Sequence, residues 1–237
     1  MESFLLFLRS HGMATAHPLC RWRQFAVALF CAGCAVIGVT VSAAPLAAIV
    51  RDAAGAVVAD AVVYAMPAAG TAAGPRSARN VVIEQVGREF VPYVTVVQAG
   101  TTVAFPNRDK LLHHVYSFSP AKTFEIKLYS GAAPFDVLFD KVGVVTIGCN
   151  IHDWMIAYVY VVDTPYFARS DSAGKAAVGE VAAGEYDLYL WHPQQRNQPA
   201  TTRLKLDGKT AAELALTIDV TPRRQKFKPP ANPASYQ

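Results

Sequence analysis

A short run in the second half of the chain contains three residues that could bind one metal ion together. Cys149, His152 and Met155 follow the pattern Cys-x2-His-x2-Met, so a thiolate, an imidazole and a thioether lie close together in the chain. His113 can supply a second imidazole from an earlier segment. Two histidines and one cysteine with a weak axial methionine are the ligands of a mononuclear blue-copper site, which transfers single electrons. The residue types therefore predict one copper ion bound by His113, Cys149, His152 and Met155.

The N-terminal segment has the features of an export signal. Residues 25–41 are almost all apolar, two arginines precede them, and Val41-Ser42-Ala43 forms a small-residue cleavage site. We predict that residues 1–43 are a signal peptide and that the mature chain lies in the periplasm. An uncleaved membrane anchor is the alternative, because the apolar stretch is longer than is typical.

Removal of this signal leaves one cysteine in the chain. Cys20, Cys31 and Cys34 lie in the signal, so only Cys149 remains. A lone thiol in an oxidising compartment, next to a histidine and a methionine, favours metal binding over an inert buried residue. A dinuclear copper site with two cysteines is excluded on this count. Zinc is disfavoured because it takes histidine, cysteine or carboxylate ligands, and thioether binds it poorly.

The composition excludes several functional classes. The formal net charge of +4 is small and scattered over 237 residues, so we expect no nucleic-acid partner. Asp109, Asp140 and Asp153 are isolated acidic residues, and no nucleophile–base pair, phosphate-binding loop or carboxylate pair stands out. We therefore expect a protein that is not an enzyme. His192 is interpreted as a structural residue.

The rest of the chain is typical of an all-β protein. Short runs rich in Val, Ile, Tyr and Thr alternate with Gly, Pro, Asn and Asp, as in β-sandwiches. The predicted strands are 46–51, 57–65, 80–85, 93–98, 101–106, 114–117, 124–127, 135–139, 143–149, 157–162, 175–181, 184–192, 201–206 and 211–218. The strand at 143–149 leads into Cys149, and the loop after it is short enough to bring His152 and Met155 around the same point.

Two changes in composition divide the strands into groups. A Gly- and Ala-rich linker covers 68–77, and a second break falls at Asp163-Thr164-Pro165. We predict a ligand-bearing domain at 76–163, between the two parts of a second domain at 45–75 and 164–220. Residues 221–237 form a basic, proline-rich tail that we predict to be disordered.

The segment from Val81 to Val162 resembles the plastocyanin/amicyanin-type cupredoxins, which are blue copper proteins. The resemblance rests on five motifs, which are Phe90-Val91-Pro92, the run from Val96 to Asn107, His113-His114-Val115, the run from Phe139 to Gly143, and the run from Cys149 to Met155. It implies a Greek-key β-sandwich with one type 1 copper ion, in which Phe90-Val91-Pro92 opens the strand that leads into the buried sheet.

The chain departs from the cupredoxin pattern around the first histidine ligand. Family members usually have proline before this histidine and asparagine after it, where this chain has Leu112 and His114. In the family that asparagine ties the two ligand loops together. Either His113 or His114 could therefore bind copper. The alignment of Asn107 and Val115 with the family favours His113, and strand alternation then places His114 on the opposite face.

The flanking segments resemble the two halves of a carboxypeptidase-regulatory-like, or transthyretin-type, β-sandwich. They share an early strand–turn–strand unit, a later Asp-x-x-Gly turn at Asp171–Gly174, and a Gly-x-Tyr strand at Gly184–Tyr186. This pattern indicates that the copper domain is inserted into a second small sandwich. The alternative is that both flanks extend one larger sandwich.

These observations predict an electron carrier. The expected partner is another redox protein, either a cytochrome or a dehydrogenase, and a membrane is involved only if the signal is uncleaved. Proteins with a similar two-part organisation are often called methylamine-utilisation proteins, which is consistent with service to a dehydrogenase. Two alternatives are copper delivery without electron transfer, and a structural module whose outer sandwich docks the chain to a larger complex.

Overall fold

The computed structural model describes residues 42–69, 81–133, 135–198 and 201–221, and all of its regular structure is β-strand. The predicted all-β class is therefore confirmed. Nearly all of the predicted signal peptide and tail, and most of the predicted linker, lie outside the described residues. Within the described ranges, no helix has the length and apolar character needed to cross a membrane.

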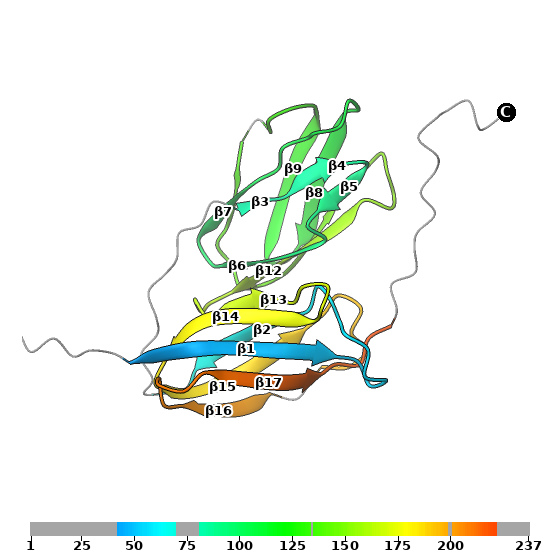
Figure 1. Ribbon diagram of the computed structural model, residues 1–237. Helices are drawn as coiled ribbons and strands as arrows, with labels where there is room; N and C mark the ends of the chain where they lie inside the picture. Colours follow the sequence, from blue (N-terminus) through cyan, green and yellow to red (C-terminus); the bar gives the residue numbers. More distant parts are fainter. Residues whose placement is uncertain (1–41, 70–80, 134, 199–200, 222–237) are drawn as a thin grey trace, which may run out of the picture. The chain divides into compact units, whose positions relative to one another are not determined.

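The strands between 81 and 162 form a five-stranded sheet, a three-stranded sheet and a two-stranded ribbon (Figure 1). The five-stranded sheet has the order β6-β12-β11-β8-β9, with β12 parallel to β6 and the other pairs antiparallel. The three-stranded sheet has the order β10-β7-β3, and β4 pairs with β5. The bounds are β3 (Val81–Val82), β4 (Glu84–Val86), β5 (Glu89–Val91), β6 (Val94–Gln98), β7 (Thr101–Ala104), β8 (His113–Ser119), β9 (Lys122–Tyr129), β10 (Val137–Phe139), β11 (Gly143–Gly148) and β12 (Ile156–Val162).

One core joins these sheets. Alternate residues of β11 and β12, among them Ile147 and Val159, are buried and belong to the same apolar cluster as Val103 of β7 and Phe139 of β10. A period of two in burial is expected of strands that cover a core with one face. Cys149 and Met155 lie within this cluster, so these two predicted ligands are part of the packed interior.

The remaining strands form two further sheets with a separate core. One has the order β14-β1-β17 and the other β13-β2-β15-β16. The bounds are β1 (Ala43–Arg51), β2 (Val62–Pro67), β13 (Phe167–Arg169), β14 (Lys175–Ala182), β15 (Gly184–Trp191), β16 (Thr202–Leu206) and β17 (Ala212–Thr217). Their apolar cluster combines residues such as Leu46 and Val63 with Tyr186 and Ile218. Since this second core joins chain segments from both sides of 81–162, we propose the division into an inserted domain and a discontinuous domain.

The largest differences between the predicted and observed strands are at four places, and most other strand ends differ by one to three residues. The strand expected at 57–65 begins only at Val62, because Asp60 adopts a left-handed φ of 62° that a strand cannot accommodate. The strand expected at 80–85 is divided into β3 and β4, and the three-residue strands β5 and β13 were not predicted.

The structure also changes the interpretation of Phe90-Val91-Pro92. These residues do not open the strand of the buried sheet. Phe90 and Val91 end β5, which pairs with β4 in the ribbon, and the buried sheet is entered only at Val94 with β6. Pro92 has no N–H to donate to a strand partner and lies between the two strands.

Candidate metal centre

Two neighbouring strands bring the predicted ligands to the same end of the five-stranded sheet. Cys149 directly follows β11, and His113 is the first residue of β8, which pairs with β11. The last residue of β11, Gly148, pairs with Tyr116 of β8. A Cβ atom at Gly148 would lie 3.0 Å from Tyr116 Cζ, so a larger residue there would require the tyrosine ring to shift. The strand before Cys149 is therefore closely packed against the strand that carries His113.

The loop after Cys149 closes on itself through backbone hydrogen bonds. The Met155 amide donates to the His152 carbonyl at 2.9 Å, and the Cys149 amide donates to the Met155 carbonyl at 3.2 Å. This short loop turns His152 back toward Cys149. Met155 is 1% exposed and lies in the same buried cluster as Cys149.

Three of the four predicted ligands converge. Cys149 Sγ lies 4.0 Å from His113 Nδ1 and 3.8 Å from His152 Nδ1. The three ligand atoms all lie within 4.8 Å of one another. Cys149 and His113 are buried, whereas His152 is partly exposed, so one edge of the cluster reaches the surface.

The spacing of these atoms fits a shared metal ion. Bonds of about 2.3 Å to sulfur and 2.0 Å to nitrogen, at about 120° to each other, place the two ligand atoms roughly 3.7 Å apart. The observed sulfur–nitrogen distances of 4.0 and 3.8 Å are close to this value. One thiolate and two imidazoles are also donors that suit copper. The residues present therefore fit a copper ion.

The structure distinguishes His113 from His114. The His113 ring lies in the cluster, and its centroid is 5.0 Å from that of His152. His114 Nε2 lies 3.0 Å from Glu125 Oε1 of β9, and its ring packs near Tyr116. The pairing of β8 with β9 shifts register between His113 and Val115, where the extra residue lies on β9 between Ile126 and Tyr129. His113 and His114 are adjacent residues of β8, so their side chains leave the strand on opposite faces.

The loop before His113 is held by the side chain of Asn107. Its Nδ2 donates to the carbonyls of Leu111 and Tyr129, both at 2.8 Å, and its Oδ1 accepts from the Asp109 amide at 2.9 Å. Asn107 is 3% exposed. These hydrogen bonds fix the conformation of the loop and attach it to the end of β9. The loop therefore holds His113 beside Cys149.

Asp109 belongs to the site, although the sequence interpretation treated it as an isolated acid. Its Oδ2 lies 2.7 Å from His113 Nε2. Burial raises the pKa of the Asp109 carboxyl, but hydrogen bonds from the Arg88 amide, the His113 ring and the Gly87 amide outweigh burial and leave the pKa below its ordinary value. Its position four residues before His113 was the only sequence signal for this contact. Asp140, by contrast, pairs with Lys122 at 3.5 Å.

His152 is suited to bind a metal as the neutral imidazole. Burial has the largest effect and lowers the pKa of His152 below its ordinary value, electrostatic interactions with His113 and Arg88 lower it further, and the opposing effect of Asp109 is smaller. A metal competes with protons for this nitrogen. A lowered pKa therefore leaves His152 deprotonated and available at neutral pH.

Exposed apolar side chains lie on both loops that carry the predicted ligands. Leu111, Leu112 and Ile151 are each about half exposed, and Trp154 and Ile156 are partly buried. Ile151 also lines a surface hollow of about 320 Å³, together with His114, Glu125, Lys127, Leu128 and Asn150. The surface near the cluster thus offers apolar contact area on both ligand loops.

Comparisons with known proteins gave matches among solved structures only. Neither a family model nor a curated protein sequence matches the chain. A purple cupredoxin from Nitrosopumilus maritimus is 22% identical, with 35% of this chain and 100% of that chain covered and a TM-score of 0.31. The reduced Cu(I) form of an amicyanin variant is 20% identical, with 44% and 99% covered and a TM-score of 0.33. A copper-containing nitrite reductase from Thermus scotoductus is 24% identical, with 41% and 25% covered and a TM-score of 0.34, so this chain spans about a quarter of that enzyme.

Proposed function

We propose that this chain is a type 1 copper protein that carries single electrons between redox partner proteins in the periplasm. The observation that supports this function is the convergence of Cys149 Sγ with the Nδ1 atoms of His113 and His152 at distances that suit one shared ion. Copper bound there would supply one-electron chemistry by cycling between Cu(I) and Cu(II). The soft sulfur ligands favour Cu(I) and the imidazoles suit Cu(II), so the donor set accommodates both states.

The protein positions the proposed ligands and buries most of them away from solvent. Cys149 and His113 are buried and lie at the ends of paired strands, so their separation is set by the sheet. Met155 is buried in the closing loop, where we propose that its thioether is the weak axial ligand. His152 is partly exposed and is the ligand through which we propose that electrons enter and leave.

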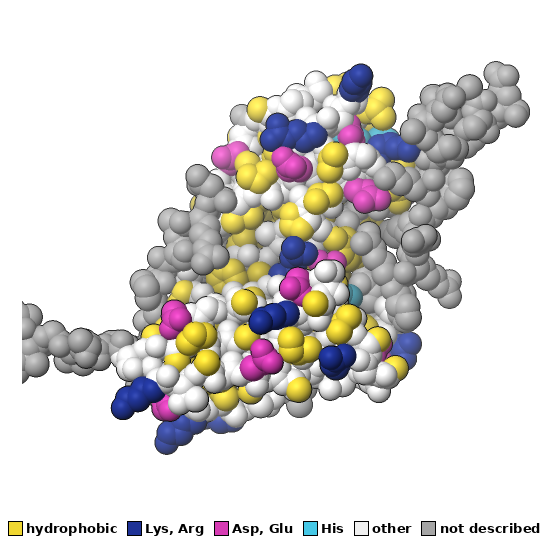
Figure 2. Space-filling view, viewed as in Figure 1, with side chains coloured by type: hydrophobic (Ala, Val, Ile, Leu, Met, Phe, Trp, Pro, Cys, Tyr) yellow, Lys and Arg dark blue, Asp and Glu magenta, His cyan; other side chains and the backbone are white. Residues whose placement is uncertain are grey.

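The surface charge fits a protein partner better than a nucleic acid. On the face that Figure 2 displays, Lys and Arg side chains lie among Asp and Glu side chains. Such a face creates no extended field of one sign. We propose a cytochrome or a dehydrogenase as the partner, and we propose that the chain itself is a carrier and not an enzyme.

The direct test is the absorption spectrum and voltammetry of the copper-loaded protein. We expect one equivalent of copper, an intense visible band from thiolate-to-copper charge transfer, and reversible one-electron cycling. One bound equivalent without such a band would contradict the blue-site assignment.

Copper delivery is the second candidate function, and the partial exposure of His152 favours it, because an incoming ligand could reach the ion there. A delivery protein should release its copper readily to an acceptor protein or chelator. An electron carrier should keep the ion through many redox cycles. Measuring copper loss during repeated cycling separates the two functions.

Replacing Met155 with leucine should leave copper bound and raise its reduction potential. A weak axial thioether stabilises Cu(II), so its removal favours Cu(I). A tenfold change in the relative affinity for the two states corresponds to about 59 mV, and we expect a rise of this order. The fold should tolerate the change, since Leu and Met swaps in cores usually cost less than about 1.5 kcal/mol. Voltammetry of the variant measures the shift, and an unchanged potential would show that Met155 is not the axial ligand.

Replacing Leu112 with lysine should slow electron transfer to a purified partner without changing the colour or the potential. A charge in the apolar patch opposes brief docking, and transient redox interfaces are small. We expect a loss of about tenfold in the bimolecular rate, equivalent to about 1.4 kcal/mol. Val142→Lys is the matched control, because Val142 is also exposed but lies before β11, at the opposite end of that strand from Cys149. Equal electron-transfer rates for both variants would mean that the partner docks on another surface, such as the β-sandwich formed by the flanking segments.

A further inference from the structure

The turn between β4 and β5 presents two backbone amides to the carboxylate of Asp109. Gly87 and Arg88 both have a φ of 60°, the left-handed conformation of a tight hairpin turn. The Gly87 amide donates to Asp109 Oδ1 at 2.6 Å, and the Arg88 amide donates to Oδ2 at 2.7 Å. The left-handed conformation is unfavourable for arginine, so the surrounding contacts must stabilise it. The carboxylate is thus held by a turn that precedes it by more than twenty residues.

The same carboxylate fixes the proton position on His113. An ionised carboxylate only accepts hydrogen bonds, so the 2.7 Å contact requires the proton on His113 Nε2. The other ring nitrogen, Nδ1, then carries the lone pair, and it is this atom that faces Cys149 Sγ at 4.0 Å. Asp109 therefore selects the tautomer that can bind a metal and also sets the orientation of the ring.

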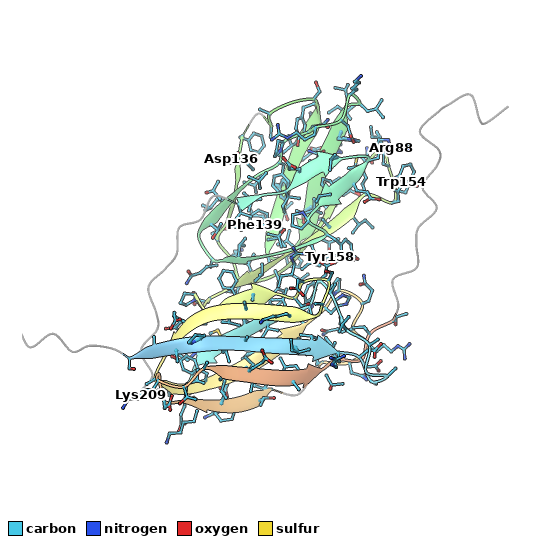
Figure 3. The ribbon with its side chains drawn as sticks, in the orientation of Figure 1. Arg88, Asp136, Phe139, Trp154, Tyr158 and Lys209 are labelled. Carbon is cyan, nitrogen blue, oxygen red and sulfur yellow. The ribbon has the colours of Figure 1, made fainter. Side chains whose placement is uncertain are left out.

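The turn also contacts the second ligand loop. Trp154 Nε1 donates to the Arg88 carbonyl at 3.2 Å, and the Arg88 guanidinium lies 5.8 Å from the Trp154 ring centroid. Figure 3 shows these two side chains next to each other. The Trp154 ring lies 5.2 Å from the His152 ring. One turn therefore contacts both ligand loops, the first through Asp109 and the second through Trp154.

His114 does not connect the two ligand loops to each other, because its ring faces Glu125 on β9. We propose that Asp109 is the positioning residue of the metal centre, fixing the tautomer and orientation of His113 and, with the β4–β5 turn, holding the two ligand loops at a set separation. This inference rests on the proposed copper site for its effect on the bound ion. The hydrogen bond to an anionic carboxylate makes the His113 imidazole a stronger donor, which favours Cu(II).

The test compares Asp109→Asn with Asp153→Asn, a matched control that removes an exposed carboxylate next to His152. In the metal-free protein, imidazole ¹⁵N shifts report the tautomer. In the wild type and in Asp153→Asn, we expect His113 to carry its proton on Nε2 alone. In Asp109→Asn, we expect the proton to exchange between Nδ1 and Nε2. In the copper-loaded protein, Asp109→Asn should bind Cu(II) about 10–100-fold more weakly. If Cu(I) binding is unchanged, a tenfold loss raises the reduction potential by about 59 mV.

Two results would overturn the proposal. One is a wild-type protein in which His113 carries its proton on Nδ1. This measurement uses the wild type alone, so it does not depend on whether a variant folds. The other is an Asp109→Asn protein with the wild-type tautomer, affinity and potential. Because the tautomer is measured without metal, it tests Asp109 even if the copper-loaded wild type lacks a blue band. Failure of the proposed function and failure of this inference are therefore distinguishable.

Discussion

Replacing Cys149 with serine should abolish the intense visible band of the copper-loaded protein completely. The band requires a thiolate bound to copper, and Cys149 is the one cysteine of the described residues. Its Sγ lies within 4.0 Å of the Nδ1 atoms of both histidines. A serine hydroxyl keeps its proton at neutral pH and cannot replace the thiolate. The absorption spectrum of the variant, titrated with Cu(II), checks the prediction.

The control for this experiment must separate loss of the ligand from loss of the fold. Cys149 is 4% exposed, and a buried hydroxyl without a partner costs about 1–3 kcal/mol. The unfolding midpoint of metal-free Cys149→Ser should therefore fall modestly while its β-sheet circular dichroism is retained. Asn150→Ser, at the exposed neighbouring position, should keep the band. A folded Cys149→Ser protein that stays intensely coloured would mean that another group binds the ion.

Replacing His113 with glycine should have a far larger effect than replacing His114 with glycine. Loss of His113 removes an imidazole from the buried cluster, and we expect copper affinity to fall by more than the roughly 10–100-fold that second-sphere changes cause. Loss of His114 removes a contact with Glu125 that faces away from the cluster, so the band should persist. Copper titration with absorption and paramagnetic resonance spectra of both variants measures the difference.

Added imidazole gives this pair a further check. A small imidazole can enter the space left by His113→Gly and should restore part of the visible band. His114→Gly is expected to retain its visible band, so added imidazole should not change its absorption spectrum. Loss of colour in His114→Gly with colour retained in His113→Gly would reverse the ligand assignment.

Residue types and local order predict copper chemistry at this site, and they were enough to predict the all-β class of the fold, which the structure confirms. Cys149, His152 and Met155 lie in one short loop, so their proximity follows from the covalent chain, and their donor atoms point to copper. Alternating apolar runs with turn residues between them predicted an all-β chain, because side chains on a strand alternate between faces. These properties depend on neighbours in the sequence, where the pattern is directly visible.

The tertiary structure decided which distant residues meet. His113 and His114 are adjacent and chemically alike, and only the folded structure shows which ring lies beside Cys149 and which lies against Glu125 of β9. Asp109 looked isolated because its partners at Gly87 and Arg88 approach it only when the β4–β5 turn is folded. Strands as short as β5 and β13 carry too few residues for a clear alternation. The alternation of apolar and polar residues within one strand can be seen directly in the sequence. The pairing of strands that are distant in the sequence depends on the packing of the whole core.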